Sequence, residues 1–366
     1  MKGKTILWAS AFALAAGAAA PANAAQWWEN TNISGKMFYD ITNINQSYYD
    51  ASGVKQKGAV SGANQNGTGY DIKRFYVGIN HKFNDIFSAN ITTDFLYDKN
   101  AGATQIFIKT AFLQAHFNPA FVIRVGAANM PWIPYMEGIY GYRYVENTLT
   151  DRTHFANSVD WGAFVLGEFA HGLLSYKIAA VNGNGYKNPT RGQGMDFEGR
   201  VSLQWHGVNL AVGGYDGKLG APQGIPTYHT ATRFDAVAAY IAHGMRIGVE
   251  YFRANDWKSV RSTTTDSADG YSAFAAYQFM PKWSLFGRYD YVNPKTIGAS
   301  VKDDYYNVGI QYSPYKMINF ALVYKHDQAT GGFLSTTNGN IGGIVGPNSN
   351  GRGSYNEIGL WGQFLW

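Results

Sequence analysis

Hydrophobic and polar residues alternate with a period of two along most of the chain. In the last ten residues, 357–366 (EIGLWGQFLW), one set of alternate positions is apolar or glycine throughout, and the other set is mixed. Because successive side chains of a strand point to opposite faces, this pattern predicts a strand with one apolar face. The same pattern occurs in 89–97, 121–126, 159–165, 195–204, 233–240, 271–279 and 318–325, so we expect an all-β fold.

The connections between these segments alternate in length. Short ones are found at 84–86, 118–120, 170–172, 206–207, 243–244, 281–282 and 314–316. Longer polar ones, most of them rich in glycine, are found at 43–70, 98–104, 129–157, 182–194, 217–229, 254–269, 293–303 and 327–354. Short turns on one rim and long loops on the other are typical of outer-membrane barrels. The hairpin count predicts about 16 antiparallel strands, with both ends of the sheet on the short-turn rim.

A sheet that spans a bilayer must close, because an open edge would leave backbone groups unpaired in lipid. The last strand should therefore pair with the first, near 33–41, and both apolar faces should meet lipid. The terminal aromatics Phe364 and Trp366 resemble the assembly signal that the barrel-assembly machinery reads in this class. A secreted β-sandwich also alternates, but its outer face would carry charges, and here one face of most strands carries almost none.

The N-terminus has the order of a secretory signal peptide. A basic start, MKGK, precedes an apolar run from Thr5 to Ala20 and a small-residue site at 22–24. We expect cleavage after Ala24, which leaves 25–366 as a single transmembrane barrel domain. Cleavage removes Lys2 and Lys4, so the formal charge of +5 falls to +3. That charge is too small to indicate nucleic-acid binding.

The composition fits a protein whose surroundings are not only water. Charged residues make up 15% of the chain, against about 25% in average globular domains, and aromatic residues make up 16%. The absence of cysteine excludes disulfides and thiolate metal sites. No motif of a serine hydrolase, zinc protease, nucleotide-binding loop or calcium loop occurs, so we expect no enzyme activity, no metal and no cofactor. A barrel enzyme is the competing class.

Barrels of 16 to 18 strands enclose an aqueous channel, so the polar faces should line a lumen. Ten basic and ten acidic residues fall on those faces, which predicts a lumen without strong net charge. The basic residues are Lys36, Arg74, Lys109, Arg124, Lys177, Arg200, Arg233, Arg246, Arg288 and Lys325. The acidic residues are Asp40, Asp94, Asp160, Glu168, Asp196, Glu198, Asp235, Glu250, Asp290 and Glu357.

The connection 129–157 differs from the other long ones. It is rich in aromatic residues and proline, and it is too apolar to extend freely into water. We expect it to fold into the lumen and to form a constriction with charges of both signs, which would select by size and polarity. The candidate constriction residues are Glu137, Arg143, Glu146, Asp151 and Arg152. The alternative is an extracellular cap or a contact within a trimer.

Four segments resemble the family of phosphate-selective porins O and P: RFYVGINHKFND (74–85), KTAFLQAHFNPAFVIRVGAANMPW (109–132), YRYVENTLTDR (142–152) and DWGAFVLGEF (160–169). In that family a strand with a glycine leads, through a proline, into an inward-folded third loop, and Gly126, Met130 and Pro131 match this pattern. The resemblance implies a 16-stranded trimeric channel in the outer membrane of a Gram-negative bacterium. The arginine ladder that gives the family its phosphate selectivity is not matched by the balanced charges found here.

These observations predict a homotrimeric porin that contacts outer-membrane lipid and lets small hydrophilic solutes and ions diffuse passively, with a mild preference for anions. One alternative is a channel specific for phosphate or another anion. Another is a structural or adhesion barrel with a plugged lumen. Conductance distinguishes them, because a plugged barrel passes no current and a specific channel is blocked by its ligand.

Overall fold

The computed structural model describes residues 29–62, 65–98, 103–258 and 260–366. The expected signal peptide, 1–24, lies outside the described residues. No helix among the described residues is long and apolar enough to cross a membrane.

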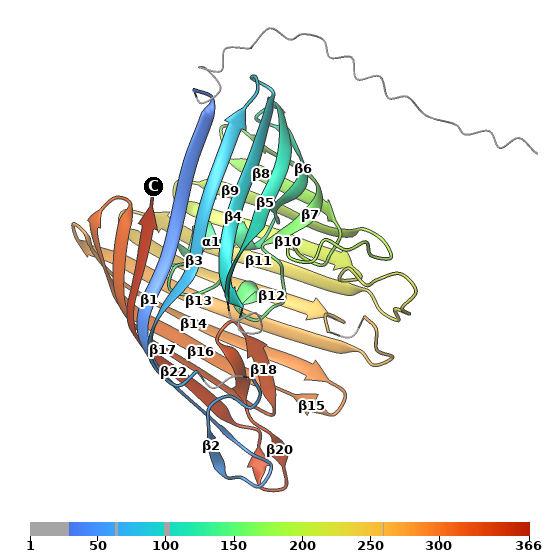
Figure 1. Ribbon diagram of the computed structural model, residues 1–366, viewed down its shortest axis with the longest axis vertical. Coiled ribbons are helices and arrows are strands. Elements are labelled where there is room, and N and C mark those ends of the chain that lie inside the picture. Colours follow the sequence, from blue (N-terminus) through green and yellow to red (C-terminus); the bar gives the residue numbers. More distant parts are fainter. Residues whose placement is uncertain (1–28, 63–64, 99–102, 259) are drawn as a thin grey trace, which may run out of the picture.

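The described chain forms a closed antiparallel barrel of 16 strands (Figure 1). The barrel strands, in order, are β1 (Thr31–Tyr49), β3 (Gly67–Lys82), β4 (Phe87–Asp98), β5 (Ala103–Asn118), β6 (Phe121–Asn129), β7 (Val159–Phe169), β8 (Leu174–Val181), β9 (Asp196–Trp205), β10 (Val208–Gly217), β11 (Ala231–Ala242), β12 (Met245–Asn255), β13 (Asp266–Met280), β14 (Trp283–Thr296), β16 (Lys302–Tyr315), β17 (Ile318–Thr330) and β22 (Gly353–Leu365). Each strand pairs with the next, and β22 pairs with β1 from Lys36↔Leu365 to Tyr48↔Gly353. The predicted pairing of the last strand with the first is confirmed.

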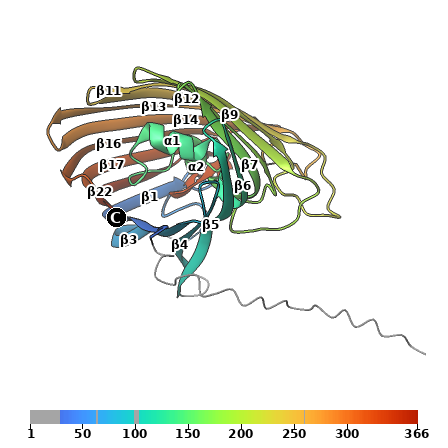
Figure 2. The ribbon, with the colours of Figure 1, turned by 90° about the horizontal axis from the view of Figure 1, so that it is seen from above.

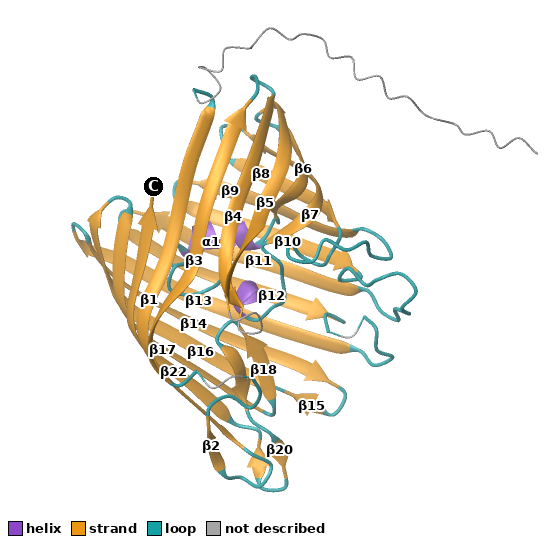
Figure 3. Cartoon of the chain, viewed as in Figure 1, coloured by secondary structure: helices purple, strands orange, loops and turns teal. Residues whose placement is uncertain are grey.

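The remaining elements all lie in long connections (Figure 3). They are β2 (Lys55–Lys57), α1 (Ile133–Tyr140), α2 (Leu149–Arg152), β15 (Ala299–Ser300), β18 (Phe333–Thr336), β19 (Gly339–Gly342), β20 (Val345–Gly346) and β21 (Ser349–Asn350). Short turns and longer loops alternate around most of the barrel, so the predicted difference between the two rims is confirmed; the predicted connection 293–303 is shorter, 297–301, because β14 and β16 extend into it. The start of β1 and the end of β22 lie on the short-turn rim.

The outer face of the barrel is apolar, as the alternation predicts. On β22, Ile358 and Leu360 are 53% and 51% exposed, while Glu357 and Trp361 are buried on the inner face. The other strands repeat this arrangement, with exposed side chains such as Val212, Phe234, Val249, Leu285 and Val308. A closed sheet with a continuous apolar exterior is the form in which strands can cross a bilayer.

The C-terminal aromatic residues are part of the barrel wall. The Trp366 ring covers Gly35 so closely that a Cβ atom at that position would lie 1.9 Å from the ring, and it also packs on Phe75 at 5.8 Å. The Tyr39 ring stacks on Phe364 at 5.3 Å. The end of the chain is therefore held across the seam that closes the barrel.

The connection between β6 and β7 lies inside the barrel. Figure 2 shows α1 and α2 within the ring of strands. Four large apolar side chains of this connection, Trp132, Met136, Leu149 and Phe155, are at most 1% exposed. They pack in two clusters against inward residues of the strands, such as Phe274 and Phe286 in one and Phe252 in the other. Burial of this apolar surface holds the connection in the lumen.

Candidate functional site

The first part of the inward connection is bound to the wall formed by β9 and β12. The Trp132 amide N–H donates to Glu198 Oε1, and its indole N–H donates to Glu250 Oε1, both at 2.9 Å. Arg200 donates to the Pro131 carbonyl at 3.1 Å and lies over the Tyr135 ring at 4.1 Å. These groups lie in the loop and on the barrel wall, so they fix the loop to one side of the lumen.

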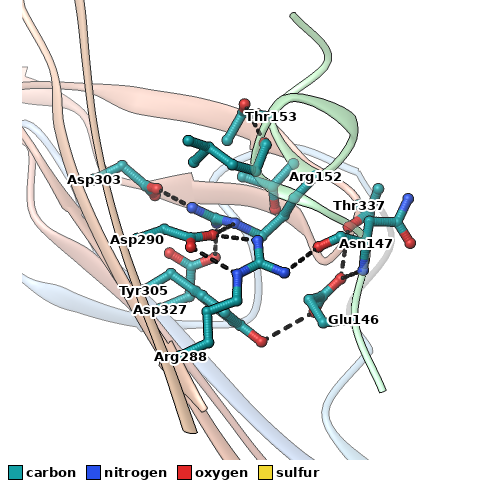
Figure 4. Close-up of polar contacts among 12 residues, drawn as sticks. Glu146, Asn147, Arg152, Thr153, Arg288, Asp290, Asp303, Tyr305, Asp327 and Thr337 are labelled. Carbon is teal, nitrogen blue, oxygen red and sulfur yellow. Dashed lines mark hydrogen bonds and ion pairs between the residues drawn. The ribbon is translucent and has the colours of Figure 1, made fainter. Parts of the chain in front are cut away.

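The second part is held by a buried charge cluster (Figure 4). The Arg152 guanidinium donates to Asp290 at 3.1 Å, Asp303 at 2.7 Å and Asp327 at 2.8 Å, and all four side chains have 0% exposure. Arg288 donates to Asp290 and, at 2.5 Å, to the Asn147 carbonyl. Charge-assisted hydrogen bonds in a dry site are strong, so this cluster is the main polar anchor of the loop.

Further inward charges of the same wall also contact the loop. Arg233 donates to the Phe155 carbonyl at 2.7 Å and pairs with Glu198 at 2.9 Å. Lys325 lies 3.4 Å from Glu146 and 3.0 Å from Glu357. Most charges on the inner faces of β9–β17 are therefore engaged with the loop or with each other and are shielded from the lumen.

The opposite wall, formed by β1 and β3–β6, is not covered by the loop. Between this wall and the loop lie two cavities, which we call the inner and the outer cavity. The inner cavity, about 500 Å³, is lined by residues in the half of the barrel near the short turns. The outer cavity, about 600 Å³, is lined by residues nearer the long loops.

Arg143 lines both cavities, so they meet at this residue. Its guanidinium donates to Glu137 at 2.8 Å and lies 3.5 Å from Asp151. Three of the five predicted constriction residues, Glu137, Arg143 and Asp151, are thus brought together at the junction. Charges of both signs at a narrow point produce a transverse field that acts on passing solutes.

The two cavities differ in charge. The inner cavity is lined by four cationic side chains, Lys36, Lys109, Arg124 and Arg143, and by one carboxylate, Glu137. The outer cavity is nearly balanced, with Lys73, Arg74, Arg143 and Lys325 against Asp40, Asp71 and Glu146. The expectation of a lumen without strong net charge therefore fits the outer cavity, whereas the inner cavity is positive. The physical reason is that the open wall of β1 and β3–β6 carries four of the ten predicted basic residues but only two of the ten acidic ones, Asp40 and Asp94.

The structure separates the other predicted residues into three groups. Lys36, Arg74, Lys109 and Arg124 lie on the open wall, with Asp94 3.5 Å from Arg74. A second group contacts the loop 130–157 directly: Arg200, Arg233, Arg246, Arg288, Lys325 and Glu198. Asp290 is bound to the loop through the ion pair with Arg152. Asp160 accepts from the Gly185 amide at 3.0 Å. Glu146 lines the outer cavity, whereas Arg152 lies against the wall and lines neither cavity.

Sequence reasoning missed two anchor residues, Asp303 and Asp327. Both were placed in long connections, 293–303 and 327–354, but both lie inside strands, β16 and β17. A signal existed, because Asp327 continues the period of two from Lys325. What the sequence did not contain is the identity of their partner, which comes from a loop more than a hundred residues away.

Comparisons with solved structures show which fold this is. A loop-deletion mutant of OmpT, an outer membrane protein of Vibrio cholerae, has a TM-score of 0.58 at 16% identity and covers 92% of this chain and 99% of its own. The outer membrane channel DcaP of Acinetobacter baumannii has a TM-score of 0.60 at 12% identity, and the match covers 92% of this chain and 97% of that channel. The anion-selective porin from Comamonas acidovorans has a TM-score of 0.61 at 13% identity, and the match covers 92% of this chain and 99% of that porin. The fold is therefore that of outer-membrane β-barrels.

No protein-family model matches the chain, and no curated protein sequence matches it. The similarity to the phosphate-selective porins O and P is not confirmed by these comparisons, which support porin-like barrels in general.

Proposed function

We propose that this chain is a porin of the Gram-negative outer membrane, through which small hydrophilic solutes and ions diffuse passively. The observation that carries the proposal is the pair of cavities that meet at Arg143 inside a closed barrel with an apolar exterior. The inward loop narrows the lumen along one wall and leaves the opposite wall open. A barrel of this strand number is wide enough to enclose water.

The charge of the inner cavity supports a preference for anions. Four cations and one carboxylate line it, and that carboxylate, Glu137, is bonded to Arg143. The low-dielectric protein walls of a narrow aqueous lumen focus such a field and raise the local concentration of anions. Salt screens the effect over about 8 Å at physiological ionic strength, so the preference should be strongest in dilute salt.

Export and assembly follow from the sequence expectations. In this proposal residues 1–24 direct secretion, and 25–366 form the barrel. Phe364 and Trp366, held across the seam, present the terminal strand to the barrel-assembly machinery. The porin acts as a homotrimer in outer-membrane lipid; a trimer form is among the similar structures of OmpT. The resemblance to porins O and P supports the same architecture.

Planar-bilayer recording of the refolded protein tests the proposal. We expect ohmic current that appears in three-step insertions, and a reversal potential that indicates more permeant anions than cations under a salt gradient. Absence of any current from protein that has a folded β-sheet spectrum would refute a diffusion channel and favour a plugged barrel. A reversal potential on the cation side would refute the preference assigned to the inner cavity.

A further inference from the structure

Three of the four cations of the inner cavity are each placed against an aromatic ring. Lys36 Nζ lies 5.7 Å from the centre of the Phe38 ring, and Lys109 Nζ lies 4.4 Å from the centre of the Tyr76 ring. The Arg124 guanidinium lies 4.9 Å from the centre of the Phe112 ring. All six residues line the same cavity. The cavity is therefore lined by three positive groups and by the aromatic rings that they contact.

In the described part of the chain, none of these three cations forms a direct ion pair with an acid. Among the described residues, Lys36, Lys109 and Arg124 form no ion pair within 4.0 Å. Lys109 donates to the Tyr76 hydroxyl at 2.8 Å, and Arg124 donates to Gln114 at 2.8 Å. Both partners are neutral, so the positive charge remains available to a solute. Additional neutral hydrogen-bonding groups line the cavity, among them Asn90, Thr110 and Asn129.

The cations are spread out and do not converge on one point. Lys36 is on β1 and Lys109 is on β5, with β3 and β4 between them. Three steps of about 4.8 Å between neighbouring strands separate their backbones by roughly 14 Å along the wall. A ligand that meets both cations needs two negative groups joined by a body. The volume of about 500 Å³ falls in the range of sites for small organic ligands.

We propose that the inner cavity is a binding site for small organic dianions, namely dicarboxylates with a flat apolar or aromatic body, which this porin selects during passage. This inference rests on the proposed function, because the site lies in the channel. The carboxylates meet Lys36, Lys109 or Arg124 through charge-assisted hydrogen bonds, and the body packs on the partly exposed Phe112 ring. Each contact faces water, so binding is weak enough to permit release.

The test is block of single-channel current by four probes added on one side of the bilayer. Terephthalate carries two carboxylates on a ring, and benzoate carries one. Cyclohexane-1,4-dicarboxylate keeps both charges without the aromatic ring, and inorganic phosphate has charge without a body. We expect terephthalate to block at the lowest concentration. The saturated dicarboxylate should need a several-fold higher concentration, and benzoate and phosphate about tenfold or more, since loss of about 1.4 kcal/mol is tenfold in affinity.

Variants connect the block to the cavity. Lys109→Gln and Arg124→Gln should each raise the half-blocking concentration of terephthalate about tenfold, because each removes one charge-assisted contact. Phe112→Leu should raise it for terephthalate and leave it unchanged for the cyclohexane compound. Lys302→Gln is the matched control, because it removes the same charge from an exposed position at the start of β16 and should leave block unchanged. A β-sheet spectrum and wild-type insertion frequency verify that each variant is folded.

The outcomes separate this inference from the proposed function. Preferred block by terephthalate that is weakened by the cavity variants and not by the control supports the site. An open, anion-preferring channel that no dicarboxylate blocks overturns the site and leaves the porin standing. Tighter block by phosphate than by terephthalate also overturns it, in favour of an inorganic oxyanion. A barrel without conductance overturns the proposed function itself.

Discussion

Replacement of Arg152 by methionine should release the inward loop while the barrel remains closed. Arg152 is the single cation that joins Asp290, Asp303 and Asp327, with three donor–acceptor distances between 2.7 and 3.1 Å and no exposure. In the variant, Arg288 still pairs with Asp290. Asp303 and Asp327 lose the cation that bonds them and are left without a positive partner in a dry site. The loop can relieve this by leaving the wall and admitting water.

Removing one partner of a buried ion pair costs about 3 to 5 kcal/mol. Because about 1.4 kcal/mol is a factor of ten, the equilibrium between docked and detached loop should shift by roughly two to four orders of magnitude. The 16 paired strands do not depend on this cluster, so the cost should appear as local opening and not as global unfolding.

Two measurements report on the loop. Single-channel current of Arg152→Met should be larger and should fluctuate, since the loop no longer narrows the lumen steadily. A protease that cleaves after aromatic residues should cut at the tyrosines of 135–144, several of which are buried in the docked state. The triple variant Arg152→Met, Asp303→Asn, Asp327→Asn should restore much of the protection, because no unpaired carboxylate remains. Lys302→Met is the control for loss of an exposed charge.

Unchanged current and protease resistance in Arg152→Met would refute the reasoning, because they would show that apolar packing alone docks the loop. Equal sensitivity of the single and triple variants would refute the part that assigns the cost to unpaired carboxylates.

Four further predictions concern other parts of the molecule. Phe234→Arg places a charge at an outward position that is 50% exposed. A charge there costs roughly 2 to 4 kcal/mol near the bilayer centre, so the yield of folded barrel should fall. Electrophoretic mobility of the unheated protein measures that yield. The neighbouring Arg233→Ser should assemble but increase current fluctuations, because it removes the donor to the Phe155 carbonyl; equal assembly defects in both variants would contradict the facing of β11. Glu137→Gln removes the carboxylate of the inner cavity and should shift the reversal potential further toward anions, and a shift toward cations would contradict the assigned field. Gly126→Ala should impair folding, because Gly126 has φ +124° and a Cβ atom there would lie 2.2 Å from the Ala111 carbonyl oxygen; wild-type thermal stability would contradict this backbone constraint.

The fold was predictable because its determinants are local in the sequence. The period of two sets which side chains face outward, and a shift of one residue would exchange both faces, so Ile358 and Leu360 could be assigned to lipid before any strand was paired. The alternation of short and long connections set the strand count and the rims. The composition of 129–157 indicated a loop that needs apolar partners.

The site was predictable only in part. Glu137, Arg143 and Asp151 belong to one connection, so their proximity could be anticipated from the sequence. The different roles of Arg152 and Arg143 could not, although both lie in the same segment: Arg143 faces the cavities, and Arg152 turns to the wall of β14, β16 and β17.

The sequence by itself determined that the chain forms a barrel with an apolar outside, a polar inside and a loop suited to enter the lumen. Only the tertiary structure decided the charge of the open passage. Ten basic and ten acidic positions cancel in a count along the chain, but the fold distributes them unevenly. The open wall of β1 and β3–β6 carries four of the bases and only two of the acids, Asp40 and Asp94, and within the described chain Lys36, Lys109 and Arg124 form no ion pair there. Electrostatic interactions depend on distance and burial, and both are set by contacts between residues far apart in the sequence.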